Sequence, residues 1–482
     1  MTQTKSLTLT TRTARAVASS NGDADVVGMV TVAAPPPAFA SAADSPRRRP
    51  RIDVALVLDT SQSMSQQRKL ELVRATVEFV LESGALLPDD RVSVTAFDSA
   101  ARTPLPLARM DERGKRACRD AVRALAARGN TNLSGGLFQG LSQVLDARDP
   151  ADVRAVLLLS DGAANVGVTD SVKLVRMAAA VAGSKAASGR APPTVSTFAY
   201  GRDADADALR ALASATGGSF YAVDSVEAVP LAFSDVVGGL ISVAAQNLVL
   251  SVTVSGARFS DAPMTRFPCE RVSDAHQVVR VNDMFVGESR DVLFRIRVPR
   301  AADGGAPPVR FEASLKYVDC VAEDAVGLES ACDVVVSERG EADPDDVEIA
   351  RQAARFAAVV ALERAKRLAD DRGDLRTAAD ALRAESDAIA VGMSRLGVDA
   401  ARDTVLRGVV SDLAAGAAAM SSSSEWANGG RARVGASAEA HAQQRSNCAG
   451  VVAGASGAGS RAYAASSKVA LMGMAAAKFN VA

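Results

Sequence analysis

Residues 53–73, DVALVLDTSQSMSQQRKLELV, decide the fold of this chain. The run Val54–Leu58 is short, apolar and without polar alternation, which predicts a strand buried on both faces of a parallel sheet. Asp59 ends this run, and a helical pattern follows over Lys69–Glu82. Oxygen-bearing side chains therefore lie at the carboxyl end of a strand, which is where open α/β sheets bind their ligands.

The same alternation of strand and helix continues through residues 50–243. Further buried strands are predicted at 91–97, 153–159 and 194–200, with helices near 69–83, 111–127, 133–147 and 171–188. A segment with two prolines at 101–107 is typical of an edge strand, and a short strand is predicted at 218–223. The prediction is a doubly wound, mostly parallel, six-stranded α/β sheet of the Rossmann-like kind.

The segments on both sides of this α/β domain have the alternating apolar and polar pattern of an antiparallel β-sandwich. Alternating strands are predicted over 246–340, and the N-terminal pieces SLTLTTRT and DVVGMVTVAAP within residues 1–45 alternate in the same way. We therefore expect the α/β domain to be inserted into a sandwich that both flanks build. Residues 345–418 are predicted to be helical, with a break at Gly373, and residues 419–482 are predicted to be largely disordered.

Composition narrows the possible partners. The chain has 482 residues with 55 basic and 56 acidic side chains, so its net charge is −1. This charge does not favour a nucleic acid or an anionic membrane as the main partner. The five cysteines form no CxxC pair, which argues against a zinc module or a dense disulfide framework. No signal-peptide core and no stretch of about 18 apolar residues occurs, so a cytoplasmic location is expected, and the oligomeric state is left open.

Three polar segments of the α/β domain are predicted to meet. Asp59, Ser61 and Ser63 form a D-x-S-x-S turn, Thr131 lies in the segment RGNTNLSGGL, and Asp161 ends the strand of RAVLLLSDGAANVG. Two carboxylates and three hydroxyls without His or Cys suit Mg²⁺ or Mn²⁺ and disfavour zinc. Because hydroxyls are neutral, the ion would keep much of its charge and could take a carboxylate from another molecule. The D-x-S-x-S turn alone could also be no more than a helix cap.

These segments resemble the von Willebrand factor type A domain and its metal-ion-dependent adhesion site. The resemblance implies that the two serines and Thr131 ligate the ion, that the two aspartates act mostly through water, and that an Asp or Glu of a partner completes the octahedron. All five positions are matched, and one departure is Gln62, where a Gly is most frequent. The resemblance predicts a metal-dependent protein–protein interaction module.

The resemblance reaches further along the chain. Residues 195–252, from VSTFAYGRDADADAL to NLVLSV, look like the end of this domain and the start of the sandwich in plant wavy-growth RING-type ubiquitin ligases and in related proteins with Hint domains. The similarity covers residues 50–400, and inter-alpha-trypsin inhibitor heavy chains are more distantly similar. Those ligases carry a zinc-binding RING ahead of this region, whereas no Cys precedes Cys118 here. Ligase activity is therefore not expected, although a role as an adaptor in the ubiquitin pathway stays an alternative.

An enzyme is the second alternative. An Asp at the end of the first strand with Mg²⁺ also describes phosphatases that form an aspartyl-phosphate, and Asp59 occupies such a position. Those enzymes need a second acid two residues later as proton donor, and this chain has Ser61 there. The two histidines, His276 and His441, have no partner in the sequence that suggests catalysis. A binding module without catalytic residues is therefore the prediction.

Overall fold

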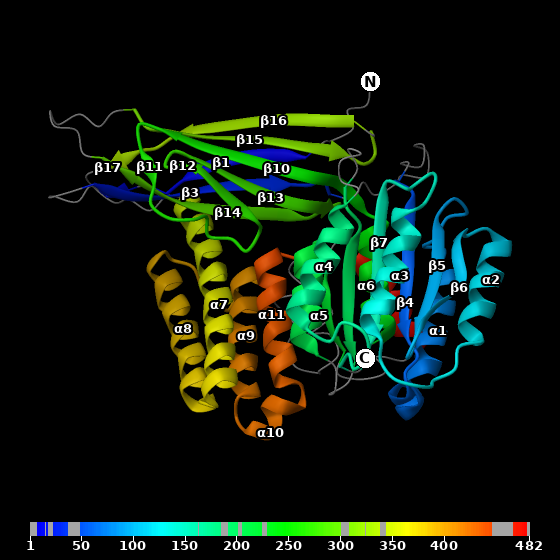
Figure 1. Ribbon diagram of the computed structural model, residues 1–482. Coiled ribbons are helices and arrows are strands. Elements are labelled where there is room, and N and C mark those ends of the chain that lie inside the picture. The colour runs from blue at the N-terminus through cyan, green and yellow to red at the C-terminus, as the bar shows by residue number, and fades with distance from the viewer. Residues whose placement is uncertain are drawn as a thin grey trace.

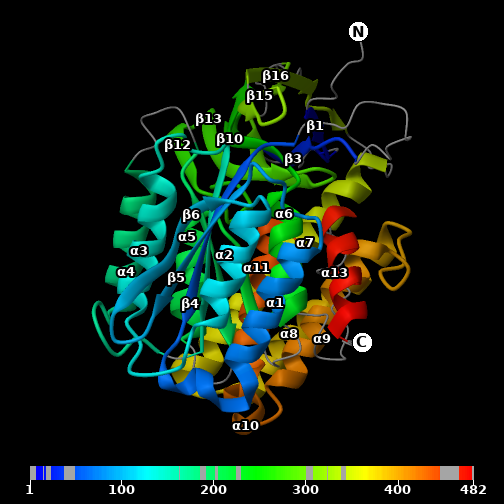
Figure 2. The ribbon, with the colours of Figure 1, turned by 90° about the vertical axis from the view of Figure 1, so that its right-hand side faces the viewer.

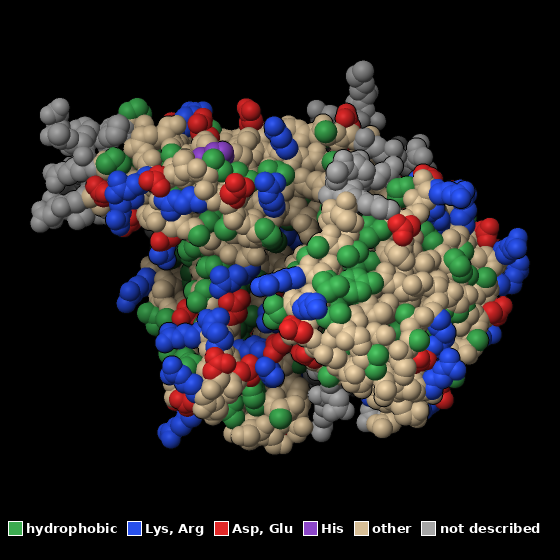
Figure 3. Space-filling view, in the orientation of Figure 1, with side chains coloured by type: hydrophobic (Ala, Val, Ile, Leu, Met, Phe, Trp, Pro, Cys, Tyr) green, Lys and Arg blue, Asp and Glu red, His purple; other side chains and the backbone are tan. Residues whose placement is uncertain are grey.

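The computed structural model describes most of the chain. The described residues are 7–14, 16–17, 23–36, 49–161, 163–184, 191–200, 205–223, 229–299, 308–322, 324–337, 344–445 and 466–479. Within them lie an α/β domain, a β-sandwich and a helical region, which pack against one another (Figures 1 and 3). Residues 37–48, between the N-terminal strands and the α/β domain, lie outside the described residues.

The α/β domain is built on one mixed sheet. Its strands are β4 (Ile52–Asp59), β5 (Arg91–Phe97), β6 (Ala101–Arg109), β7 (Val153–Ser160), β8 (Thr194–Tyr200) and β9 (Phe220–Val223). The six strands lie in the order β6-β5-β4-β7-β8-β9, and of the pairings only that of β6 with β5 is antiparallel. β6 is an edge strand, where Pro104 and Pro106 cost no interior hydrogen bond. The predicted fold class is confirmed.

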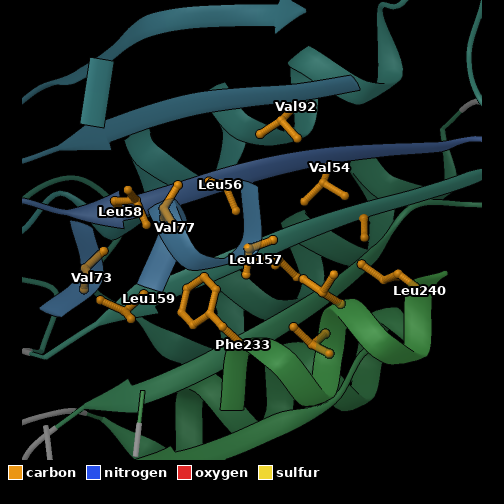
Figure 4. Packing of buried hydrophobic residues seen from close by; sticks show 14 of the residues in the cluster. Val54, Leu56, Leu58, Val73, Val77, Val92, Leu157, Leu159, Phe233 and Leu240 are labelled. Carbon is orange, nitrogen blue, oxygen red and sulfur yellow. The ribbon is translucent and has the colours of Figure 1, made fainter. Parts of the chain in front are cut away.

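Helices cover both faces of this sheet. One face carries α1 (Lys69–Glu82), α2 (Glu112–Arg123) and α6 (Val229–Leu240), and the other carries α3 (Leu133–Leu145), α4 (Ser171–Gly183) and α5 (Ala206–Thr216) (Figures 1 and 2). Successive residues of β4 point to opposite faces, so Leu56 packs in the first layer and Val57 in the second. Figure 4 shows the first layer, where Phe233 of α6 lies close to Leu157 of β7. Burial on both faces explains the unbroken apolar sequence of the central strands.

The β-sandwich has two antiparallel sheets. Its strands are β1 (Thr8–Thr13), β3 (Ala24–Ala33), β10 (Val243–Ser255), β11 (Arg258–Phe259), β12 (Cys269–Ser273), β13 (His276–Phe285), β14 (Ser289–Val298), β15 (Arg310–Asp319) and β16 (Asp324–Asp333). One sheet has the order β1-β3-β14-β11 and the other β12-β13-β10-β15-β16. β2 (Ala16–Val17) and β17 (Val336–Ser337) form a short parallel pair beside them.

The N-terminal strands are integral to this sandwich. β3 pairs along its whole length with β14, and Val30 lies opposite Val292 in the register. Both side chains belong to the sandwich core, to which β10 contributes Val252. Because β3 and β10 flank the α/β domain in sequence, that domain is inserted into the sandwich between them.

The helical region follows the sandwich. It contains α7 (Pro344–Arg372), α8 (Leu375–Arg395), α9 (Thr404–Ala419) and, further along, α11 (Arg431–Gln443). Gly373 ends α7 with φ +64°, and the Asp374 side chain caps α8 by accepting a hydrogen bond from the Thr377 N–H at 3.1 Å. No helix in the described part of the chain is both long and apolar enough to cross a membrane.

The tail after residue 419 differs from the prediction. α10 (Ser423–Glu425) and the short helix η4 (Trp426–Gly430) lead into α11. α13 (Ser466–Phe479) packs against α6, and its Phe479 ring contacts Phe79 of α1. Small residues suggested disorder because they contribute little apolar area, but they also let helices approach closely. Ala438 of α11 is buried in the helical region, and Ala436 is buried in the α/β domain. The prediction of disorder is wrong for these segments.

His441 has a partner that its sequence context did not reveal. The ring is fully buried in α11, and its Nε2 lies 2.9 Å from a carboxylate oxygen of Asp412 on α9. The Nη1 of Arg355, on α7, donates to the backbone carbonyl of His441 at 2.6 Å. His441 thus takes part in joining three helices, α7, α9 and α11.

A buried ion-pair network ties the end of α11 to the sandwich. Arg445 donates to Glu288 at 3.0 Å and to Asp283 at 2.9 Å, and Arg290 donates to the same Glu288 at 2.7 Å. The Arg445 guanidinium also lies 3.9 Å from the ring centroid of Phe285. All four charged side chains are buried and have lost their contacts with water. The ion pairs among them must therefore compensate for the lost hydration.

Candidate functional site

Three loops meet at the carboxyl end of the central strands. The loop after β4 carries Ser61 and Ser63, the segment before α3 carries Thr131, and Asp161 directly follows β7. β4 and β7 are hydrogen-bonded parallel neighbours, so the last residue of β4, Asp59, and Asp161 share one edge of the sheet.

Asp59 is fully buried, and both of its carboxylate oxygens are engaged. One oxygen accepts from the Ser61 N–H at 2.8 Å, and the other accepts from the Ser160 hydroxyl at 2.7 Å. Burial raises the pKa of Asp59 from 3.8 to about 6, the negative charge of Asp161 adds to the rise, and the bonds from Ser160 and Ser61 oppose it. Ser160, the last residue of β7, is therefore a further member of the site that the sequence did not predict.

Ser61, Ser63 and Asp161 form one contact chain. The hydroxyl oxygens of Ser61 and Ser63 lie 3.1 Å apart, and the Ser63 hydroxyl donates to a carboxylate oxygen of Asp161 at 2.6 Å. Ser61 and Asp161 are 2% and 1% exposed, whereas Ser63 between them is half-buried. Four of the five predicted residues are therefore brought into one hydrogen-bonded cluster.

Thr131, the fifth residue, is positioned through its backbone. Its N–H donates to the Asn165 side chain at 2.8 Å, and its carbonyl accepts from the Asn165 N–H at 3.1 Å. Just before Thr131, the Gly129 carbonyl accepts a hydrogen bond from the Gln62 N–H at 3.1 Å. This bond joins the Thr131 segment to the loop that follows β4. No described residue hydrogen-bonds the Thr131 hydroxyl, although the residue is only 5% exposed.

The glycines after Thr131 explain how α3 sits so close to the sheet. A Cβ added at Gly140 would lie 2.2 Å from the Val57 side chain, and one added at Gly136 would lie 2.4 Å from Phe97. Only glycine permits this approach, which brings the start of α3 to the ends of the central strands. The glycine-rich sequence is therefore a packing requirement of the site's supporting helix.

Lys69 is a member of the cluster that sequence reasoning missed. Its Nζ donates to the second carboxylate oxygen of Asp161 at 2.7 Å, and the two side chains are 9% and 0% exposed. The sequence contains an indication of this role. Lys69 is the first residue of α1, where a cation opposes the helix dipole. A lysine in that position needs a compensating anion nearby.

The side chains present fit a hard divalent cation. Mg²⁺ takes six oxygens at 2.0–2.1 Å, so neighbouring ligand oxygens lie about 2.9 Å apart. The 3.1 Å between the Ser61 and Ser63 hydroxyls is close to this value, and the unpaired Thr131 hydroxyl is a third neutral oxygen. Among the described residues, no three His, Cys, Asp or Glu side chains gather in a metal-binding group, so any ion here would depend on the hydroxyls.

The raised pKa of Asp59 predicts a specific pH dependence of stability. Between pH 3.8 and about 6 the folded chain holds a proton on Asp59 that the unfolded chain has released, so stability falls as pH rises. Above a pH of about 6, Asp59 is charged in both the folded and the unfolded chain. Burial of this charge then lowers the free energy of unfolding by its full amount, about 3 kcal/mol for a shift of this size. Asp59→Asn, which mimics the protonated acid, is expected to remove this cost.

Urea unfolding with a chelator present measures this effect. Asp59→Asn should be more stable than the unmodified chain above a pH of about 6, and the difference should vanish near pH 3.8. Comparing the two proteins at each pH cancels the titration of all other groups. A difference in unfolding free energy that does not change with pH would contradict the burial cost assigned to Asp59.

The comparisons with known proteins agree with this architecture. Residues 53–235 match the von Willebrand factor type A domain family. The probable E3 ubiquitin-protein ligase WAVH2 of Arabidopsis thaliana is 25% identical over 278 residues, which are 56% of this chain and 35% of that protein. This chain therefore spans only about a third of the length of that relative.

Two solved structures share the fold over most of the chain. The von Willebrand factor type A protein from Catenulispora acidiphila has a TM-score of 0.60 at 17% identity and covers 85% of this chain and 91% of its own. The ArnB paralog VWA2 from Sulfolobus acidocaldarius has a TM-score of 0.55 at 14% identity and covers 91% and 99%. Residues 53–235 of this chain are thus a von Willebrand factor type A domain, set between a β-sandwich and a helical region.

Proposed function

We propose that this chain is a divalent-metal-dependent protein-interaction module, and that Asp59, Ser61, Ser63, Thr131 and Asp161 hold Mg²⁺ or Mn²⁺. The observation that carries the proposal is the contact chain from Ser61 through Ser63 to Asp161, with oxygen separations of 3.1 Å and 2.6 Å. Such a spacing of hard oxygens at the carboxyl end of a parallel sheet suits an octahedral cation.

The proposed ligand of this site is a carboxylate of another protein. Three of the five metal-holding side chains are neutral hydroxyls, so only the two carboxylates offset the charge of the ion, and one of them, Asp161, also pairs with Lys69. The ion would supply a strong electrostatic bond to an Asp or Glu side chain at the rim. Arg128 on the Thr131 segment and Arg102 both bind Asp98, at 3.1 Å and 2.6 Å, and hold the neighbouring loops in place around that position.

Hydrolysis by Asp59 has less support. An aspartyl nucleophile needs a free oxygen facing its substrate, whereas both oxygens of Asp59 accept hydrogen bonds and the side chain is fully buried. The position two residues later is Ser61, which cannot act as the proton donor that such enzymes use. The ligase named among the relatives matches over only 35% of its length, so its activity is not proposed for this chain.

Metal binding is tested by calorimetry and by thermal unfolding with and without Mg²⁺. We expect Mg²⁺ to raise the melting temperature, because a ligand that binds only the folded state adds about 2.7 kcal/mol at a hundredfold excess over its Kd. Asp161→Ala should abolish both the binding heat and the shift. The double variant Ser61→Ala/Ser63→Ala should do the same.

Asp149→Ala is the matched control, since Asp149 is an exposed acid that pairs with Arg51 ahead of β7, at the other end of that strand. This variant should keep the full response to Mg²⁺. Equal Mg²⁺ binding in the unmodified chain and in Ser61→Ala/Ser63→Ala would refute the assignment of the site.

A further inference from the structure

Lys69 places a buried positive charge directly against a proposed metal-holding carboxylate. Asp161 accepts from the Ser63 hydroxyl with one oxygen and from the Lys69 ammonium with the other, at 2.6 Å and 2.7 Å. Lys69 is 7% exposed as a residue, and Asp161 is 1% exposed. The ammonium is therefore part of the site and not a solvated surface charge.

Two physical costs oppose this placement of Lys69. It is the first residue of α1, where the helix dipole disfavours a cation, and burial removes the water that solvates an ammonium. Both costs are met here by the negative charge of the site, which comes from Asp161 and from Asp59 behind it. Without a cation, these two buried carboxylates would repel each other across the ends of β4 and β7.

We infer that Lys69 is a resident cation of the site, which neutralises Asp161 when no divalent ion is bound and competes with Mg²⁺ for that carboxylate. The inference rests on the proposed function, because it assumes that the same oxygens bind a metal. The competition follows from charge. An ammonium 2.7 Å from a carboxylate oxygen halves the negative charge that two aspartates would offer, and it repels a dication at the same rim.

The consequence is a site that loads only at a high concentration of free Mg²⁺. Once an ion is bound, the Lys69 charge also adds to the positive field that a partner carboxylate meets. Lys69 is thus a positioning residue that acts through Asp161, and it sets the threshold at which the interaction module becomes active. Removing its charge should tighten metal binding while it weakens the metal-free fold.

The experiment compares Mg²⁺ affinity by titration calorimetry in the full chain and in two neutral variants. Lys69→Met removes the charge, and Lys69→Gln removes it while keeping a hydrogen-bond donor for Asp161. Both are expected to bind Mg²⁺ at least roughly tenfold more tightly than the unmodified chain. Their melting temperatures without metal should be lower, so the Mg²⁺-induced shift should be larger. If Lys69→Met does not fold, Lys69→Gln decides.

Lys468→Met is the matched control. Lys468 is also buried and donates to the carboxylate of Asp235 at 2.9 Å, but this pair lies between α13 and α6. This variant should lose stability without any change in Mg²⁺ affinity. It therefore separates a general loss of a buried ion pair from the specific competition assigned to Lys69.

The outcomes distinguish this inference from the proposed function. Binding by the unmodified chain with equal or weaker binding by Lys69→Met and Lys69→Gln overturns the inference and leaves the metal site in place. Binding only by the neutral variants supports the competition and overturns metal binding by the unmodified chain. If none of the three proteins binds Mg²⁺, both the inference and the proposed function are wrong.

Discussion

A chain that begins at Arg49, and so lacks β1 and β3, is expected to be insoluble. β3 lies between β1 and β14, and its removal would leave the whole of β14, Ser289–Val298, without a partner on that side. It would also uncover the sandwich core, where Val30 and Val292 are 0% and 1% exposed. A long unpaired edge next to an exposed apolar face is a template for aggregation. Sedimentation of the expressed protein and size-exclusion chromatography measure the loss.

A pair of point variants tests the same idea without a deletion. Val30→Asp places an unpaired charge in the sandwich core and should destabilise the full chain severely, whereas Thr8→Asp lies at an exposed position of β1 and should not. If the chain that begins at Arg49 is as soluble and as thermally stable as the full chain, the N-terminal strands do not hold the sandwich together.

Arg445→Met is expected to lower the free energy of unfolding by roughly 3–5 kcal/mol. The substitution leaves Glu288 and Asp283 buried with less compensation, because Arg445 donates to both of them. Met keeps most of the apolar volume over Phe285, so the loss reports the charge and its hydrogen bonds. Urea unfolding at neutral pH measures it.

Arg297→Met is the control for this prediction. Arg297 pairs with Asp25 at 3.0 Å on the exposed surface of the same sandwich, and the loss of such a pair is expected to cost less than about 1 kcal/mol. Equal effects of the two substitutions would contradict the role assigned to the buried network.

The network also predicts a response to acid. Burial alone would raise the pKa of Glu288, but the charges of Arg290 and Arg445 outweigh it and lower this pKa from 4.5 to about 2. A lowered carboxylate pKa stabilises the fold above pH 4.5, and this contribution is lost as pH falls toward 2. In Arg445→Met the pKa of Glu288 should rise, so acid unfolding should begin at a higher pH.

The α/β domain could be predicted because its strands carry a local signal. Strands buried on both faces must be apolar at every position, and Val54–Leu58 and Val156–Leu159 have this property in the sequence itself. The mostly parallel order follows, since every connection between successive strands except that from β5 to β6 contains a helix. The four residues Asp59, Ser61, Ser63 and Asp161 could be placed together because the ends of neighbouring parallel strands share one edge.

The sandwich could be predicted from the alternation of apolar and polar residues along its strands, which is also a local pattern. The same alternation occurs before and after the α/β domain, which indicated that the two segments pair. Register was different. That Val30 lies opposite Val292 depends on contacts between segments more than two hundred residues apart, and no short-range pattern specifies them.

The sequence by itself determined the strands, the helices and the oxygen-bearing ends of β4 and β7, because the period of apolar residues and the turn residues act over a few positions. The tertiary structure alone decided which charges are buried against which partners. Lys69 meets Asp161, Arg445 meets Glu288, and His441 meets Asp412. The tail shows the same limit, since helices rich in alanine are stabilised by the surfaces on which they pack, and those surfaces come from distant parts of the chain.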